Sequence, residues 1–259
     1  MKITVAEYLG ILASFALLAI GAVLFDLGVF GTALLLVVIP VVWLWMQLHP
    51  PLSLVAIIAV FAVGSTLIFE AIAASNGLWY SVPDVDMLLF GVVPVELFFA
   101  TFVFNAFALL LYEFFVDDRS FDEPRSHKHY RWLLFFALST TIIGVLSAVM
   151  LHGVVMPFAF AALLMVVVGT LGLVVWLSHS ASRVLARKAL LGAGLLFPFY
   201  VIHELVALFN TQVVYANPGQ YLYYIPLLGN DWPIEKLVFF IAVPLWLIVV
   251  YEVYLDDGE

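Results

Sequence analysis

The segment Pro94–Phe99 reads PVELFF, and a related segment, Pro233–Val238, reads PIEKLV. Sliding the first segment onto the second by 139 residues places Glu96 on Glu235. The same offset brings further polar residues into register: Tyr112 with Tyr251, Glu113 with Glu252, and Asp117-Asp118 with Asp256-Asp257. The chain has only 18 acidic residues, so this many matches at one offset indicate an internal duplication.

The composition is that of an all-α integral membrane protein. Hydrophobic residues make up 66% of the chain and charged residues 10%, against about 25% charged residues in globular domains. The mean hydropathy is +1.18, so the lipid bilayer is the expected environment. Because the chain has no cysteine, disulfides and thiolate metal sites are excluded. The net charge of -9 argues against a nucleic-acid partner.

About eight apolar stretches are each long enough for a transmembrane helix, which needs roughly 20 residues. We expect a first membrane repeat of four helices over 1–118, a cytoplasmic linker over 119–130 and a second membrane repeat over 131–259. Because four helices return the chain to the side on which it started, the two repeats are expected to be parallel. The expected spans are about 5–25, 29–48, 53–74, 88–115, 132–151, 157–177, 190–210 and 233–254.

Basic residues set the expected orientation in the membrane. Of the 9 Lys and Arg, only Lys236 falls on the side opposite the N-terminus and the linker. The positive-inside rule therefore places both termini in the cytoplasm of a multi-pass protein of the plasma membrane. Four glutamates then fall in the outer half of the bilayer at comparable depth: Glu70, Glu96, Glu204 and Glu235.

These four carboxyls are the candidate catalytic residues. An ionised carboxyl in hydrocarbon costs about 2.5 to 3.5 kcal/mol on insertion scales, and such residues usually mark a function. One protonated and one ionised carboxyl together supply a general acid and a general base. The alternative for Glu96 and Glu235 is compensation of a helix dipole, since each lies two residues after a proline at an expected helix start. Glu113 and Glu252, beside tyrosines, are expected to anchor the cytoplasmic interface.

A resemblance to a known family rests on two segments of the first half. Gly77–Tyr80 (GLWY) and Phe90–Phe99 (FGVVPVELFF) resemble the lycopene cyclase domain of the non-flavin carotenoid cyclases, the heterodimeric or fused type. That family also carries two tandem proline-x-glutamate helices, so the likeness covers both halves. Its motif glutamates match Glu96 and Glu235. Its acidic position on the preceding helix matches Glu70 and Glu204.

The resemblance implies a lycopene cyclase without cofactor or metal, an intramolecular lyase or isomerase. A glutamate protonates the terminal double bond of an acyclic end group, the carbocation closes a ring, and proton loss completes a redox-neutral reaction. In keeping with this, the sequence shows no glycine-rich nucleotide loop and no metal-ligand spacing. Expected partners are the lipophilic carotenoid and other enzymes of carotenoid biosynthesis. The residues expected to bind substrate, mainly through ring faces that stabilise a cation, are Phe98, Phe99, Trp79, Trp232, Phe239, Phe240 and His203.

The chain departs from the family at two positions. The family usually has a second acid directly after each motif glutamate, where this chain has Leu97 and Lys236. Two other functions therefore stay open. A carotenoid hydratase would trap the same cation with water, and a proton-coupled transporter would use the carboxyls as a relay. Lys236 itself is expected to pair with Asp231 or with a glutamate.

Overall fold

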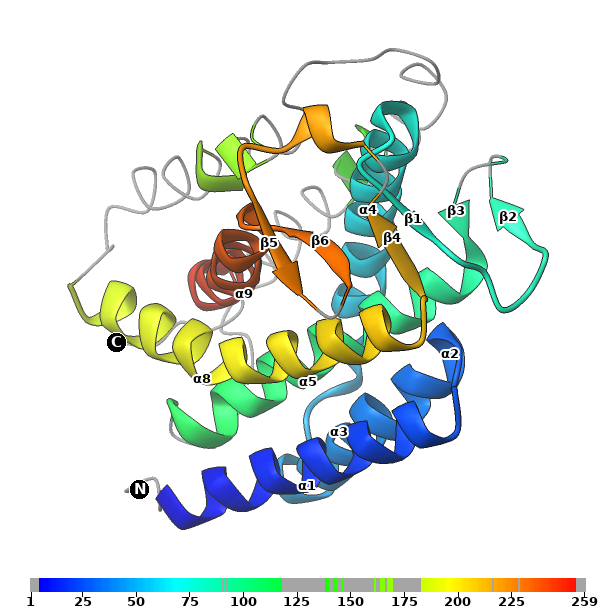
Figure 1. Ribbon diagram of the computed structural model, residues 1–259. Helices are drawn as coiled ribbons and strands as arrows, with labels where there is room; N and C mark the ends of the chain where they lie inside the picture. The colour runs from blue at the N-terminus through cyan, green and yellow to red at the C-terminus, as the bar shows by residue number, and fades with distance from the viewer. Residues whose placement is uncertain are drawn as a thin grey trace.

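The computed structural model of the protein describes residues 5–117 except 90 and 92, isolated residues between 138 and 169, and residues 183–254 except 216 and 228. This part of the chain is mostly helical, with short strands (Figure 1). The expected linker over 119–130 lies outside the described residues, and so do most residues of the expected spans at 132–151 and 157–177.

Within the described residues, five helices are long and apolar enough to cross a membrane. Each of them overlaps a span that the sequence predicts. Their length and composition thus indicate a multi-pass membrane protein. They cover Val5–Leu24, Val29–Leu48, Leu54–Asn76, Val95–Phe115 and Leu185–Phe209.

The first two spans differ in regularity. α1 (Val5–Leu24) is a plain α-helix. The second span is one continuous helical run made of α2 (Val29–Thr32), the π-helical segment η1 (Ala33–Val38) and α3 (Ile39–Leu48). Pro40 accounts for the π-helical segment, because proline has no N–H to donate to the preceding turn and its ring crowds the carbonyl there.

α4 (Leu52–Asn76) and α8 (Arg183–Phe209) end in the same kind of turn. Gly77, directly after α4, has φ +62°, and Thr211, the second residue after α8, has φ +50°. Both are left-handed, the conformation that commonly terminates a helix. The turns are closed by equivalent hydrogen bonds from the next amide to the last helical turn: Leu78 N to Ala73 O at 2.9 Å and Gln212 N to Ala207 O at 2.8 Å.

The polar segments that follow these two helices pair with each other. β1 (Trp79–Ser81) follows α4, β4 (Val213–Tyr215) follows α8, and the two strands run antiparallel in a two-stranded sheet (Figure 1). Tyr80 lies opposite Val214 at the centre of the pair, and 134 residues separate them, as they do the two turns. The sheet therefore joins equivalent points of the first and second halves of the chain.

A β-hairpin precedes each of the two remaining long helices, α5 (Val95–Phe115) and α9 (Glu235–Tyr254). The expected span over 88–115 was wrong at its start, since its first residues form a hairpin. The reason is Pro94, which forces the residue before it into an extended conformation and so delays the helix. The hairpin strands are β2 (Leu88–Leu89) with β3 (Val93–Pro94), and β5 (Tyr224–Leu227) with β6 (Asn230–Pro233); the 3-10 turn η2 (Pro218–Gln220) lies between β4 and β5.

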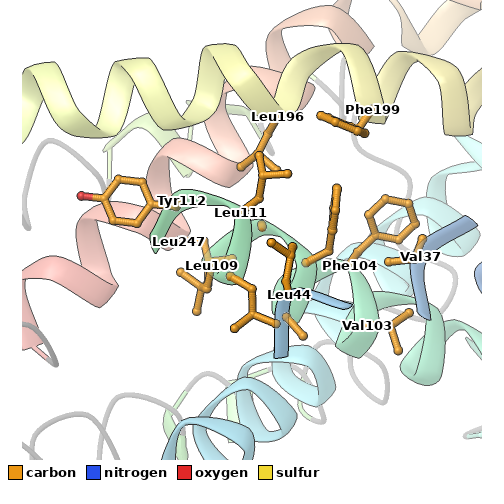
Figure 2. Packing of buried hydrophobic residues seen from close by; sticks show 14 of the residues in the cluster. Val37, Leu44, Val103, Phe104, Leu109, Leu111, Tyr112, Leu196, Phe199 and Leu247 are labelled. Carbon is orange, nitrogen blue, oxygen red and sulfur yellow. The ribbon is translucent and has the colours of Figure 1, made fainter. Parts of the chain in front are cut away.

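α5 is the central helix of the described bundle. Every residue from Val103 to Phe115 is buried, as expected for a helix that is apolar on all sides. α5 packs against α3, α4, α8 and α9. Figure 2 shows side chains of this core, among them Leu111 of α5, Phe199 of α8 and Leu247 of α9. The packed helices leave a cavity near the strands, at the start of α5 and the end of α8.

Candidate functional site

A cavity of about 210 Å³ lies where α4, α5, α8 and α9 meet the β1–β4 pair. Its wall is mostly apolar, with aromatic rings such as Phe104 from α5 and Phe239 and Phe240 from α9. Two carboxyls line it, Glu70 from α4 and Glu204 from α8. The cavity therefore brings together one predicted acid from each of the two helices that end in the same turn.

Glu70 faces the cavity from near the end of α4. Trp79 in β1 donates its indole Nε1–H to Glu70 Oε1 at 3.1 Å. The left-handed turn at Gly77 reverses the chain, which is how an indole reaches a carboxyl nine residues earlier. Trp79, which was expected to bind substrate, thus lines the cavity and also holds an acid in place.

Glu204 is held by groups from three different elements. Tyr215 OH donates to Glu204 Oε1, and Trp232 Nε1 donates to the same oxygen at 3.4 Å. Lys236 Nζ lies 3.7 Å from Glu204 Oε2, which confirms the expected pairing of this lysine with a glutamate. Burial, and then the neighbouring Glu204 carboxylate, raise the pKa of the Tyr215 phenol well above its ordinary value of 10.0. Tyr215 therefore remains a hydrogen-bond donor to Glu204 at neutral pH.

Lys236 is the only lysine or arginine among the described residues that line the cavity. Only 10% of its side chain is exposed. Ring faces attract a cation, and four of them surround its ammonium group. The distances from Nζ to the ring centroids are 5.0 Å for Trp79, 5.7 Å for Tyr215, 5.5 Å for Phe239 and 5.7 Å for Phe240. A positive charge is thus stabilised here by a carboxylate and by an aromatic cage.

His203 and Thr66 add further polar groups to the cavity wall. The His203 ring packs edge-on against Phe104, with a centroid distance of 4.4 Å and an interplanar angle of 79°. Thr66 Oγ1 is buried and has no hydrogen-bond partner among the described residues. Sequence reasoning missed Thr66 and Tyr215, because threonine is common in apolar helices and Tyr215 belongs to no motif.

The two motif glutamates are not among the residues that line this cavity. Glu96, in the first turn of α5, accepts a hydrogen bond from the backbone N–H of Asp84 at 2.6 Å. Glu235, in the first turn of α9, accepts one from the backbone N–H of Leu222 at 2.5 Å. The second oxygen of each glutamate is buried without a hydrogen-bond partner in the described part of the chain. Both glutamates therefore hold the loop that precedes their own helix.

Asp84 connects Glu96 to the start of the second span. Its Oδ1 accepts a hydrogen bond from Val29 N at 3.1 Å, and its Oδ2 accepts one from Phe30 N at 2.7 Å. Asp84 thus caps α2 from a distant loop. Gly28 makes room for the carboxylate, because a Cβ at this position would lie 1.8 Å from Asp84 Oδ1.

Three residues expected to bind substrate lie outside the cavity wall. Phe99 packs against Phe30, with ring centroids 4.9 Å apart. Trp232 lies behind Phe240 at a centroid distance of 6.4 Å and reaches the site through its hydrogen bond to Glu204. Phe98 is half-buried in the first turns of α5. The other four expected residues, Trp79, Phe239, Phe240 and His203, line the cavity.

A second buried polar cluster joins the last turns of α5 and α9. Tyr112 OH donates to Glu252 Oε1, and Tyr251 OH donates to Glu113 Oε1. Lys188 Nζ of α8 lies 4.0 Å from Glu252 Oε1. Glu113 is fully buried, and Glu252 is 9% exposed. The expectation that these glutamates anchor a membrane interface was wrong, because phenols of the opposite helix enclose them.

No protein-family model, curated protein or solved structure matches the chain. In the part of the chain that the structure describes, no group of three or more His, Asp or Glu side chains is arranged to hold a metal ion.

Proposed function

We propose that the protein is a membrane-embedded carotenoid-modifying enzyme of the lycopene cyclase type, which protonates an acyclic end group. The observation that carries this proposal is the shared chamber: Glu70 and Glu204 line one mostly apolar cavity. A hydrocarbon substrate offers no charge to recognise. Its reaction instead needs a proton donor and a proton acceptor in a site with little water, and the two carboxyls of the cavity wall supply both.

The proposed reaction begins when one carboxyl gives its proton to the terminal double bond and leaves a tertiary carbocation. That cation attacks a second double bond of the same end group, so a C–C bond closes the ring and the charge moves into it. The second carboxyl then removes a proton, and a ring double bond forms. The substrate is isomerised without gain or loss of electrons.

The surroundings of the two carboxyls support different roles for them. Glu204 accepts two hydrogen bonds and lies beside the Lys236 ammonium group, an arrangement that suits a carboxylate acting as the base. Glu70, the other carboxyl that lines the cavity, is then assigned as the acid. Trp79, Phe239 and Phe240 contribute aromatic rings to the cavity wall, which supports a role in stabilising the carbocation.

The size of the cavity supports action on one end of a long molecule. A volume of about 210 Å³ is below the roughly 300 to 1,000 Å³ of a site that encloses a drug-sized ligand. It suits an end group, while the polyene chain extends along the apolar helices. The partners of the proposed enzyme are the carotenoid, the bilayer and other enzymes of carotenoid biosynthesis.

A carotenoid hydratase is the second candidate, and one observation favours it. Thr66 Oγ1 lies in the cavity wall without a hydrogen-bond partner among the described residues, so it offers a place for a water molecule. Such a water would attack the carbocation before the ring closes and give its extra proton to the second carboxyl. The product would then carry a hydroxyl group in place of a ring.

The test is expression in a host that makes acyclic carotenoids, followed by chromatography and mass spectrometry of the extract. A cyclase yields a product of unchanged mass, and a hydratase adds the mass of water. Removal of a general acid or base lowers turnover by about a hundred- to ten-thousand-fold, so Glu70→Gln and Glu204→Gln should each lose product. Asp86→Asn, in the exposed loop between β1 and β2, is the matched control. Wild-type turnover in either glutamine variant refutes the assignment, and unchanged carotenoid with proton flux favours a transporter.

We infer further that the chain crosses the plasma membrane eight times, in two parallel four-helix repeats with both termini in the cytoplasm. Asp84 before α5 caps α2, and Gln212 after α8 donates from Nε2 to Leu27 O at 2.6 Å. These bonds support a common side for the ends of α1, α4 and α8. Lys188 near the start of α8 pairs with Asp117 after α5 at 2.8 Å, which supports a common opposite side.

This topology can be tested by introducing one cysteine at a time. The chain has no cysteine of its own, so the introduced residue is the only thiol that a reagent can label. Val85→Cys lies in the exposed loop between β1 and β2, and Arg187→Cys lies on the exposed surface of α8 near its start. A membrane-impermeant thiol reagent should label Val85→Cys in intact cells and Arg187→Cys only after permeabilisation. Labelling of both, or of neither, in intact cells contradicts the inferred orientation.

A further inference from the structure

We propose that Lys236 is a covalent attachment site, at which its amine forms an imine with a lipophilic conjugated aldehyde bound in the cavity. This inference is independent of ring closure and rests on the position of Nζ. Lysine at the start of a helix ordinarily extends its charged end to water. Lys236 instead lines the cavity and is 8% exposed as a residue.

The fold does not require a lysine at this position. The 139-residue offset relates Lys236 to Leu97, the residue after Glu96 in α5. Leu97 also lines the cavity. One wall of the chamber thus presents an aliphatic side chain where the equivalent wall presents an amine. A lysine in an apolar pocket is the side chain that enzymes use to condense with carbonyl groups.

The surroundings of Nζ suit both the reaction and its product. Glu204 Oε2, 3.7 Å from Nζ, can take a proton from the ammonium group and so free the amine. The amine then attacks the carbonyl carbon, and the C–N bond forms. Protons delivered through Glu204 convert the carbonyl oxygen into water, which leaves as the C=N bond forms. In total an ammonium and an aldehyde become an iminium and water, so the charge opposite Glu204 is unchanged.

The same cage selects the class of ligand. Trp79, Phe239 and Phe240 present ring faces to the position where the iminium charge lies. An apolar chain attached to that iminium would lie along the apolar cavity wall. Conjugation would spread the positive charge along this chain, which lowers its cost in an apolar site. An aldehyde with its own carboxylate is disfavoured, because Glu70 and Glu204 line the same space.

The experiment uses the full chain in detergent micelles with citral, an acyclic isoprenoid aldehyde, and cyanoborohydride to reduce any imine. Peptide mass spectrometry then locates the modified lysines. We expect Lys236 to be modified at least about tenfold faster than the more exposed Lys188, a ratio equivalent to about 1.4 kcal/mol in barrier. Lys236→Arg keeps the charge and cannot form an imine, so it should lose this modification only. Equal modification of Lys188 and Lys236, or none at Lys236, overturns the proposal.

Two further probes separate a built site from general aldehyde reactivity. Glyoxylate, a charged aldehyde, should modify Lys188 and spare Lys236; preferential modification of Lys236 by glyoxylate overturns the selectivity argument. Retinal should give a red-shifted absorbance in the wild type, as expected for a protonated imine. In Glu204→Gln the counter-charge is missing, so the imine should lose its proton, and with it the red-shifted band, at a lower pH than in the wild type. Loss of the band at the same pH in both proteins overturns the assigned counter-ion.

Discussion

The phenol of Tyr112 on α5 donates a hydrogen bond to the carboxylate of Glu252 on α9. Tyr251, 139 residues after Tyr112, donates in return to Glu113. The two copies of the Tyr-Glu dipeptide therefore contact each other between α5 and α9. Each copy supplies the donor for the acid of the other. This reciprocity explains how two carboxyls are tolerated between apolar helices, since a buried acceptor without a donor is costly.

Tyr112→Phe and Tyr251→Phe should each destabilise the protein by about 1 to 3 kcal/mol, because each removes the phenol donor of a buried carboxyl. Unfolding in detergent micelles, followed by circular dichroism against denaturant, measures the loss. Tyr223→Phe is the control, since Tyr223 is 65% exposed, and surface changes of this kind stay within about 0.5 kcal/mol. Equal stability of all three variants would contradict the prediction that these hydrogen bonds stabilise the fold.

Glu96 offers a direct contrast between an anchor and a catalytic acid. Glu96→Gln keeps the carbonyl oxygen that accepts the Asp84 amide, whereas Glu96→Ala removes it. If Glu96 anchors the loop, the alanine variant should lose about 1 to 3 kcal/mol of stability and the glutamine variant less. Carotenoid turnover by Glu96→Gln should stay near that of the wild type. Loss of turnover in a stably folded Glu96→Gln variant would show that Glu96 takes part in catalysis.

The Tyr215–Glu204 contact predicts a dependence of stability on pH. Burial raises the pKa of Tyr215 above its ordinary value of 10.0, so the folded state favours the protonated phenol. The resulting stability is complete below pH 10.0 and is lost as pH rises through the folded-state pKa. The stability difference between the wild type and Tyr215→Phe should therefore be constant at neutral pH and shrink at alkaline pH. Denaturant midpoints across this range measure it, and a difference that grows with pH would contradict the sign.

Two glycines of α8 should respond in opposite ways to the same substitution. A Cβ at Gly192 would lie 2.7 Å from both Tyr112 Cδ2 and Ile248 Cδ1, whereas a Cβ at Gly194 meets nothing within 4 Å. Gly192→Ala should cost about 1 to 3 kcal/mol through overpacking. Gly194→Ala should be neutral or stabilise by up to about 1 kcal/mol, because alanine favours the helix. Equal unfolding midpoints for the two variants would contradict the close packing of α8 on α5 and α9.

The helices of the described chain were the most predictable feature. Apolar stretches of membrane length are local properties of the sequence, so the expected spans at 5–25, 29–48 and 190–210 overlap α1, the α2–η1–α3 run and α8. Boundaries were less predictable where a proline intervenes, as before α5. Polar partners were the least predictable, because Glu113 and Glu252 read locally as residues at a membrane surface and are buried by contacts between distant helices.

The sequence by itself determined the membrane setting, the repeated polar residues and the four glutamates as the acids to consider. Only the tertiary structure divided those acids into Glu70 and Glu204 at the cavity and Glu96 and Glu235 on loop backbone. The physical reason is that hydrophobicity and repetition are local properties, which can be read from the order of residues alone. Which carboxyl shares a chamber with which depends on turns and strand pairing that bring positions more than a hundred residues apart into contact.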